Sequence, residues 1–119
     1  MKTETIFFNH LQREITYYIG KNDKDNFEII DASNPNDIWF HANNISSSHV
    51  ILKLSNIDTN IDKKDLRQLI KKGALLCKQN TNKLNNNNIF EFIYTEIKNI
   101  EKTDKIGCVI TKNTKTISC

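Results

Sequence analysis

The stretch Asp37–Leu52, DIWFHANNISSSHVIL, combines β-forming residues with many of the side chains in this sequence that can do chemistry. It holds two of the three histidines, the only tryptophan and three consecutive serines. Apolar and aromatic residues flank a small polar centre, which is the pattern of two strands joined by a loop. We therefore predict adjacent strands at 37–41 and 49–54. Their connection consists of small polar residues and could adapt to a ligand.

Side chains alternate between the two faces of a strand, and this decides which residues of the stretch can act together. Trp39 and His41 should share one face, and His49 should join them from the neighbouring strand. Ser48 should point the other way, so His49 cannot easily activate it as a nucleophile. A metal site needs three or four close ligands, and the sequence has no H-x-H, C-x-x-C or H-E-x-x-H spacing. The histidines are therefore predicted to be hydrogen-bonded fixtures, neither catalytic nor metal-binding.

Outward from this stretch, short β-branched and aromatic segments alternate with polar turns, which indicates further strands. The polar segment after Gly20 is interpreted as a loop or the start of a short helical turn through 27–30. The other strands are predicted at 4–9, 14–19, 89–97, 107–110 and 114–118, with the last two forming a hairpin around 112–113.

The clearest helix is predicted at about 62–79, with Asp62 as its N-cap. Its apolar residues recur at i, i+3, i+4, i+7, i+8 and i+11, which makes one buried stripe. Strands, one long helix and then strands indicate an α+β fold, a single compact domain over 1–119 with a mostly antiparallel sheet packed against that helix. The stripe consists of Leu66, Leu69, Ile70, Gly73, Ala74 and Cys77.

Positive charge is concentrated in the second half of the chain. Residues 1–61 hold five Lys and Arg against eight acids, whereas 62–119 hold twelve against six. Within the helix, the acids Asp62 and Asp65 both stand at the start, so most of its cations lack a partner four residues away. This pattern favours an anionic partner such as nucleic acid over a simply solvated face. The predicted nucleic-acid-binding residues are Lys64, Arg67, Lys71, Lys78, Lys98 and Lys102.

Other function classes find little support in the sequence. The three glycines are isolated, so no phosphate-cradling loop is present and no cofactor is expected. The three cysteines are scattered, which predicts reduced thiols and a cytoplasmic setting. The first residues have neither the charge pattern nor the apolar core of a signal peptide, and no apolar run approaches the length of a membrane span. No oligomeric state is predicted.

The same opening stretch closely resembles the NFACT-R domain. That family's pattern runs aspartate, apolar, tryptophan, apolar, histidine, a short linker and then serine-histidine-valine. Further similarities follow in order over about 12–119, among them Tyr18–Asn22, Gly73–Cys77, Tyr94–Thr95 and Gly107–Val109. The matching motif positions are Asp37, Trp39, His41, Ser48 and His49.

The NFACT-R domain occurs in large ribosome-associated quality-control factors and, almost alone, in small eukaryotic coiled-coil-containing proteins. The serines before His49 are more similar to the stand-alone type. The resemblance implies an RNA-binding role in translation or tRNA chemistry. The tailing domain of the large factors and the charged coiled-coil extension have no counterpart in the sequence, so activities and partners that depend on them are not expected.

We expect a non-catalytic nucleic-acid-binding module whose partner is RNA, either tRNA or ribosome-associated rRNA. A protein-interaction module docking on a translation-related, ribosome-associated protein is the main alternative, and DNA is a second possible target. An enzyme acting through His41 and His49 is the least favoured hypothesis. The motif residues are as compatible with a structural role as with direct contact.

Overall fold

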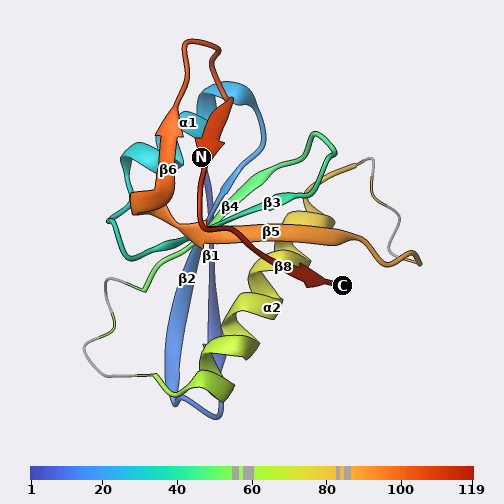
Figure 1. The fold of residues 1–119 in the computed structure, drawn as a ribbon. Coiled ribbons are helices and arrows are strands. Elements are labelled where there is room, and N and C mark those ends of the chain that lie inside the picture. Colours follow the sequence, from blue (N-terminus) through green and yellow to red (C-terminus); the bar gives the residue numbers. More distant parts are fainter. Residues whose placement is uncertain (55–56, 58–60, 83, 85–86) are drawn as a thin grey trace.

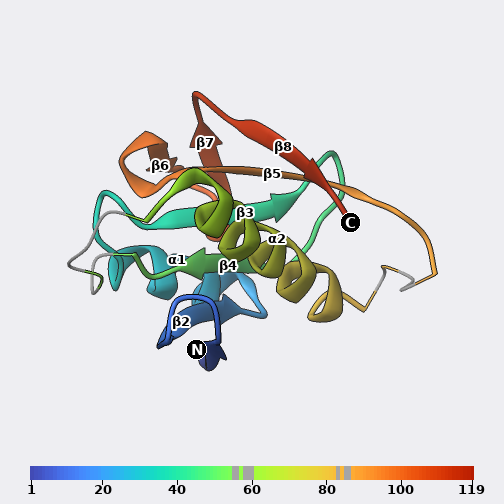
Figure 2. The same ribbon diagram turned by 90° about the horizontal axis from the view of Figure 1, so that it is seen from below.

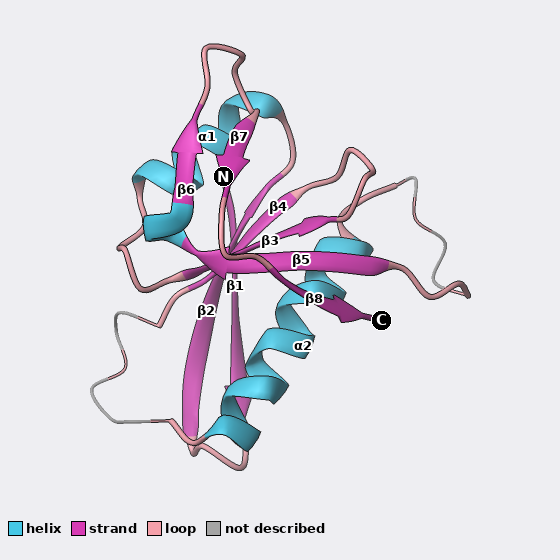
Figure 3. Ribbon diagram, viewed as in Figure 1, coloured by secondary structure: helices cyan, strands magenta, loops and turns pink. Residues whose placement is uncertain are grey.

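The computed structural model describes residues 1–54, 57, 61–82, 84 and 87–119. These residues form a six-stranded antiparallel sheet in the order β1-β2-β4-β3-β5-β8, a separate β6–β7 pair and two α-helices (Figure 1, Figure 3). The predicted α+β class is confirmed. The elements are β1 (Lys2–Phe8), β2 (Arg13–Gly20), α1 (Asp23–Asp31), β3 (Ile38–Ala42), β4 (His49–Leu52), α2 (Lys63–Gln79), β5 (Glu91–Glu96), the 3₁₀ turn η1 (Ile97–Asn99), β6 (Ile100–Lys102), β7 (Val109–Thr111) and β8 (Lys115–Ser118).

The long helix α2 packs against one face of the sheet, in the angle between β1–β2 and β5–β8 (Figure 1, Figure 2). Asp62 caps it as predicted, because its side chain accepts a hydrogen bond from the Asp65 backbone N–H at 2.8 Å. The predicted apolar stripe lies against the sheet. At Gly73 a Cβ atom would come within 2.5 Å of the Phe40 ring, so glycine allows the helix to approach β3 closely. The core on this face includes Tyr17, Ile19, Phe40, Val50, Leu52, Leu69, Ala74, Cys77 and Phe92.

The opposite face of the sheet packs against α1 and the β6–β7 pair, around buried Ile29, Trp39 and Ile51. The sequence indicated only a short helical turn here, whereas α1 is a nine-residue helix. Asn22 caps it by accepting a hydrogen bond from the Asp25 N–H at 2.8 Å. Asn22 therefore starts a full helix in the segment that was predicted as a polar loop or short helical turn. The buried side chain of Ile29 packs this helix against the sheet.

The hairpin predicted from 107–110 and 114–118 is wrong. β7 pairs with β6, and β8 instead pairs with β5 at the edge of the large sheet. The two segments separate because their apolar residues belong to opposite faces: Val109 packs with Trp39, whereas Ile117 packs with the core under α2. A local turn signal at 112–113 could not reveal this division.

Candidate nucleic-acid interface

Trp39, His41 and His49 form one aromatic cluster on the face of the sheet opposite α2. The indole N–H of Trp39 donates a hydrogen bond to Nδ1 of His49 at 3.0 Å. The His41 ring stacks on the indole with an interplanar angle of 8°, and the two imidazoles meet edge-on. The alternation of the two strands thus brings the three motif rings together as predicted.

Both histidines of the cluster are held in the neutral form. Burial lowers the pKa of His49 to about 3, and the neighbouring His41 adds to the effect. Burial also lowers the pKa of His41, against the opposing hydrogen bond to the Ala42 carbonyl. A pair of neutral rings gives this cluster no charge with which to attract phosphate.

Asp37 is fully buried and has a structural role at the start of β3. Its carboxylate accepts hydrogen bonds from the backbone N–H groups of Asn34 and Leu54, each at 2.8 Å, and forms an ion pair with the buried ammonium of Lys53. The side chain therefore ties together the turn before β3 and the segment after β4. None of these contacts leaves the carboxylate facing solvent.

Ser48 points away from His49 toward α2. Its hydroxyl donates to the backbone carbonyl of Asn80 at 2.7 Å, and its N–H donates to Thr81 Oγ1 at 3.0 Å. The serine thus fastens β4 to the end of α2. The predicted separation of Ser48 from His49 is confirmed, and the two cannot form a nucleophile–base pair in this arrangement.

Three of the predicted basic residues, Lys64, Arg67 and Lys71, are exposed on one side of α2; we call them the α2 cation row. None of the three forms an ion pair with a carboxylate among the residues that the structure describes. Their positions i, i+3 and i+7 place them along one helical stripe about 10 Å long. The row is an unneutralised positive surface facing solvent.

Lys78 follows the same spacing but lies elsewhere. Its side chain is only 6% exposed, and its ammonium donates hydrogen bonds to the backbone oxygens of Asn88 at 2.7 Å and Cys119 at 3.2 Å. Helical spacing predicted a solvent-facing position, but the segment before β5 and the residue after β8 cover the side chain. We leave Lys78 out of the surface.

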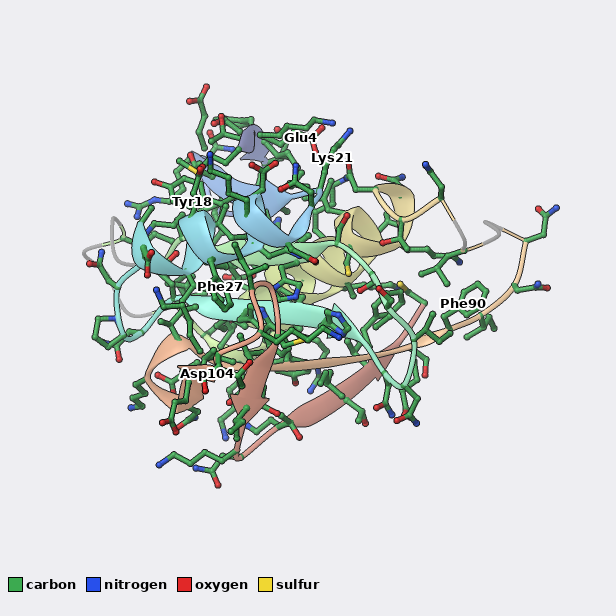
Figure 4. The ribbon with its side chains drawn as sticks, turned by 90° about the horizontal axis from the view of Figure 1, so that it is seen from above. Glu4, Tyr18, Lys21, Phe27, Phe90 and Asp104 are labelled. Atoms are coloured by element: carbon green, nitrogen blue, oxygen red, sulfur yellow. The ribbon has the colours of Figure 1, made fainter. Side chains whose placement is uncertain are left out.

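Lys102 is on the opposite side of the molecule from the row. It lies on β6, where its ammonium pairs with Asp31 at 2.6 Å and sits 5.2 Å from the centre of the Phe27 ring. Figure 4 labels Phe27 in the view toward this side, with Asp104 in the nearby loop. Proximity in sequence to Lys98 suggested a shared surface, but Lys102 pairs with Asp31 of α1, whereas Lys98 lines the groove beside α2.

A groove of about 540 Å³ separates the first half of α2 from β3, β5 and β8. Lys98 and Lys115 line its sheet side, and Leu66 and Ile70 of α2 line the other. Lys98 is 54% exposed and only loosely paired with Glu96, at 3.5 Å. Lys115 was not among the predicted residues, because its position depends on the unforeseen pairing of β8 with β5.

Lys71, at the end of the cation row, acts electrostatically on Cys119, the residue after β8. Burial raises the pKa of the Cys119 thiol, and the ammonium groups of Lys78 and Lys71 oppose that shift, so both lie near the thiol. The cation row thus stands on the helix that forms one wall of the groove, and Lys98 and Lys115 line the other wall; we call these five residues the basic region. Across the described residues no set of three or more His, Cys, Asp or Glu is placed to hold a metal ion. No helix in the same residues is long and apolar enough to cross a membrane.

Comparison with known proteins adds three findings. The family model described as the NFACT protein RNA binding domain matches residues 5–117. Coiled-coil domain-containing protein 25 of Danio rerio is 37% identical over 94 residues, covering 74% of this chain and 42% of that protein. The Dictyostelium discoideum homolog of the same protein is 30% identical over 105 residues, covering 82% of this chain and 47% of that one. The chain thus spans less than half the length of these relatives.

A solved structure shares the fold. The C-terminal part of the fibronectin/fibrinogen-binding protein from Streptococcus suis superimposes with a TM-score of 0.77 over 99% of this chain and 45% of that one. Sequence identity between the two is 23%, so the likeness concerns the arrangement of helices and strands.

Proposed function

We propose an RNA-binding function for this chain, which belongs to the NFACT RNA-binding domain family. The family makes it a nucleic-acid-binding module. The observation that carries the more specific proposal is the α2 cation row, three exposed cations that form no ion pair among the described residues, beside a groove that Lys98 and Lys115 line. Phosphate groups attract Lys and Arg irrespective of sequence and supply most of the affinity of such surfaces.

The proposed partner is tRNA or rRNA, in translation or ribosome-associated quality control in the cytoplasm. The family's RNA-binding description and the three free thiols support this setting. We assign the chain no catalytic step, because Ser48 and His49 face opposite ways. Contacts with the phosphates of the RNA would come from the basic region.

The salt dependence of binding tests the surface. If Lys64, Arg67, Lys71 and Lys98 each neutralise one phosphate, the logarithm of affinity for single-stranded RNA should fall with that of salt concentration at a slope of about −2.8. Fluorescence anisotropy of a labelled RNA across a salt series measures this slope. An affinity that does not change with salt, or no binding at low salt, would refute the proposal.

A charge-reversal variant tests the location. Changing Arg67 and Lys71 to glutamate should reduce the slope to about −1.4 and weaken binding about 25-fold or more at 0.1 M salt. Both side chains are exposed, so the melting temperature should hardly move. The matched control K24E/K105E changes two exposed residues away from α2, alters the net charge equally and should weaken binding much less. Equal losses in the two variants would show that net charge, and not the α2 surface, determines binding.

Competition at fixed salt between RNA and DNA oligonucleotides of the same sequence tests the nucleic acid. Displacement of the labelled RNA at a lower concentration of RNA competitor than of DNA competitor supports the proposal. Stronger competition by DNA would reassign the surface to DNA. Co-purification of ribosomal proteins that survives nuclease treatment, in a chain that fails to bind RNA, would favour a protein-interaction module.

A further inference from the structure

A second cavity lies on the opposite face of the sheet from the cation row. It has a volume of about 240 Å³ and lies between the aromatic cluster of β3–β4 and the returning arm of the β6–β7 hairpin. That volume is below the range of roughly 300–1,000 Å³ that accommodates drug-sized ligands, so the cavity suits a smaller group. The residues that line it include Trp39, His41, His49, Ile93, Gly107 and Cys108.

The hydrogen-bonding pattern of the cluster defines what the cavity presents. The indole N–H of Trp39 can only donate, so Nδ1 of His49 accepts and the proton of this neutral ring is on Nε2. The Ala42 carbonyl can only accept, so Nδ1 of His41 carries the proton and its Nε2 is an acceptor. The two rings therefore offer one donor and one acceptor.

Both Nε2 atoms lack a hydrogen-bond partner in the part of the chain that the structure describes. No hydrogen bond among the described residues involves either of them. Yet every fully buried side-chain nitrogen and oxygen in those residues has a partner. His49 is only 3% exposed, so its Nε2 must reach space through the cavity that its ring lines. A donor on a buried ring destabilises the fold when it forms no hydrogen bond, so a ligand or water is expected to accept from it.

The wall of the cavity opposite the histidines includes Gly107 and Cys108, and the backbone at Gly107 fixes its position. Gly107 has a φ of 83°, and a Cβ there would lie 2.7 Å from the Asp23 side chain. Only glycine lets the hairpin lie this close to the start of α1. The cavity is thus a defined space between fixed walls.

From these observations we propose that the cavity binds a single unstacked nucleobase. All four RNA bases have an edge with a donor beside an acceptor, and single-stranded RNA offers such edges when bases are splayed out. The neutral imidazoles suit an uncharged planar group and give no attraction to a phosphate. The choice of a nucleobase among flat heterocycles rests on the proposed function.

Cys108 provides a direct readout because it lines the cavity and its thiol is free and exposed. A bound base should shield it from alkylation. At a nucleoside concentration of about ten times the Kd, the rate at Cys108 should fall about tenfold by mass action. Cys119, at the end of β8 beside α2, is the internal control and should react at an unchanged rate. Peptide mass spectrometry after timed iodoacetamide treatment measures both rates in the unmodified protein.

The probes are the four ribonucleosides, with ribose as the matched ligand that lacks a base. Protection of Cys108 by at least one nucleoside but not by ribose is the expected result. The variant His41→Phe retains a ring on Trp39 and removes the acceptor, so it should lose the protection. Equal alkylation of Cys108 with and without all four nucleosides would overturn the proposal, as would full protection in the variant.

The test separates this proposal from the RNA-binding surface. In R67E/K71E the nucleosides should still protect Cys108, because that pair lies on the other face of the sheet. Protection by nucleosides in a protein that binds no RNA would refute the proposed function and leave the pocket standing. Salt-dependent RNA binding without nucleoside protection would refute the pocket alone.

Discussion

Acidification should destabilise this fold through His49 in a defined pH window. The pKa of His49 is lowered from 6.5 to about 3 by burial and by the neighbouring His41. In the unfolded chain the ring regains its ordinary pKa, so between the two values the unfolded state binds a proton that the folded state does not. Stability is therefore complete above pH 6.5 and is lost as the pH falls toward 3.

The size of the effect follows from proton linkage. In the middle of the window, each pH unit removes about 1.4 kcal/mol of unfolding free energy per such group. Between pH 7.5 and 4.5, His49 alone should remove about 2.6 kcal/mol. That is a large share of the roughly 5–15 kcal/mol that stabilises a domain.

Urea denaturation followed by Trp39 fluorescence at several pH values measures the effect. Carboxylates also titrate below pH 5, so the informative quantity is the difference between this protein and His49→Gln. The glutamine oxygen can still accept the indole hydrogen bond, and the variant should lose stability more gently between pH 7 and 5. Parallel pH dependences of unfolding free energy in the two proteins would refute the assignment of a neutral, buried imidazole.

Three further predictions concern the core. G73A should destabilise the fold by up to about 2 kcal/mol, because overpacking against Phe40 outweighs the higher helix propensity of alanine; thermal unfolding measures this, and a raised melting temperature would contradict the close packing. K53M should cost about 3 kcal/mol or more in urea, since it leaves the buried carboxylate of Asp37 without its cation, and D37N/K53M should recover part of the loss. The thiol of Cys77, whose pKa burial raises to about 12, should resist alkylation at pH 8 until the protein unfolds, and modification as fast as at Cys108 would show that the core opens locally.

Local sequence patterns were sufficient to predict the strands and the helix whose two sides carry clearly different side chains. Alternation placed Trp39 and His41 opposite Ile38 and Phe40, and helical spacing with Asp62 as cap located α2. In each case a single periodicity of the apolar residues determines both the type of element and the side that faces the core. The separation of Ser48 from His49 follows from the same alternation.

The parts that could not be predicted depend on contacts between distant segments. Lys78 has the spacing of an exposed residue, and it is buried because Asn88 and Cys119 fold over it. Lys102 is four residues from Lys98, yet its ammonium pairs with Asp31 of α1, whereas Lys98 lines the groove beside α2. The neighbours of His41 in the cavity, Gly107 and Cys108, come from a hairpin whose partner strand gave no clear sequence signal.

The sheet therefore separates the cation row from the aromatic cluster, and the motif residues Trp39, His41 and His49 belong to that uncharged cluster. Asp37 is neutralised by Lys53, Trp39 donates to His49, and His41 donates to the Ala42 carbonyl, which leaves the two Nε2 atoms without a hydrogen bond among the described residues. Phosphate contacts give affinity and register, whereas base contacts carry sequence information. If both proposals hold, the cation row should govern how binding depends on salt, and the cavity should govern which base is preferred. The motif histidines would then contribute to base selectivity, while the cation row of α2 would bind the RNA backbone. Changes on one face of the sheet should therefore alter base preference or salt dependence and leave the other property unchanged.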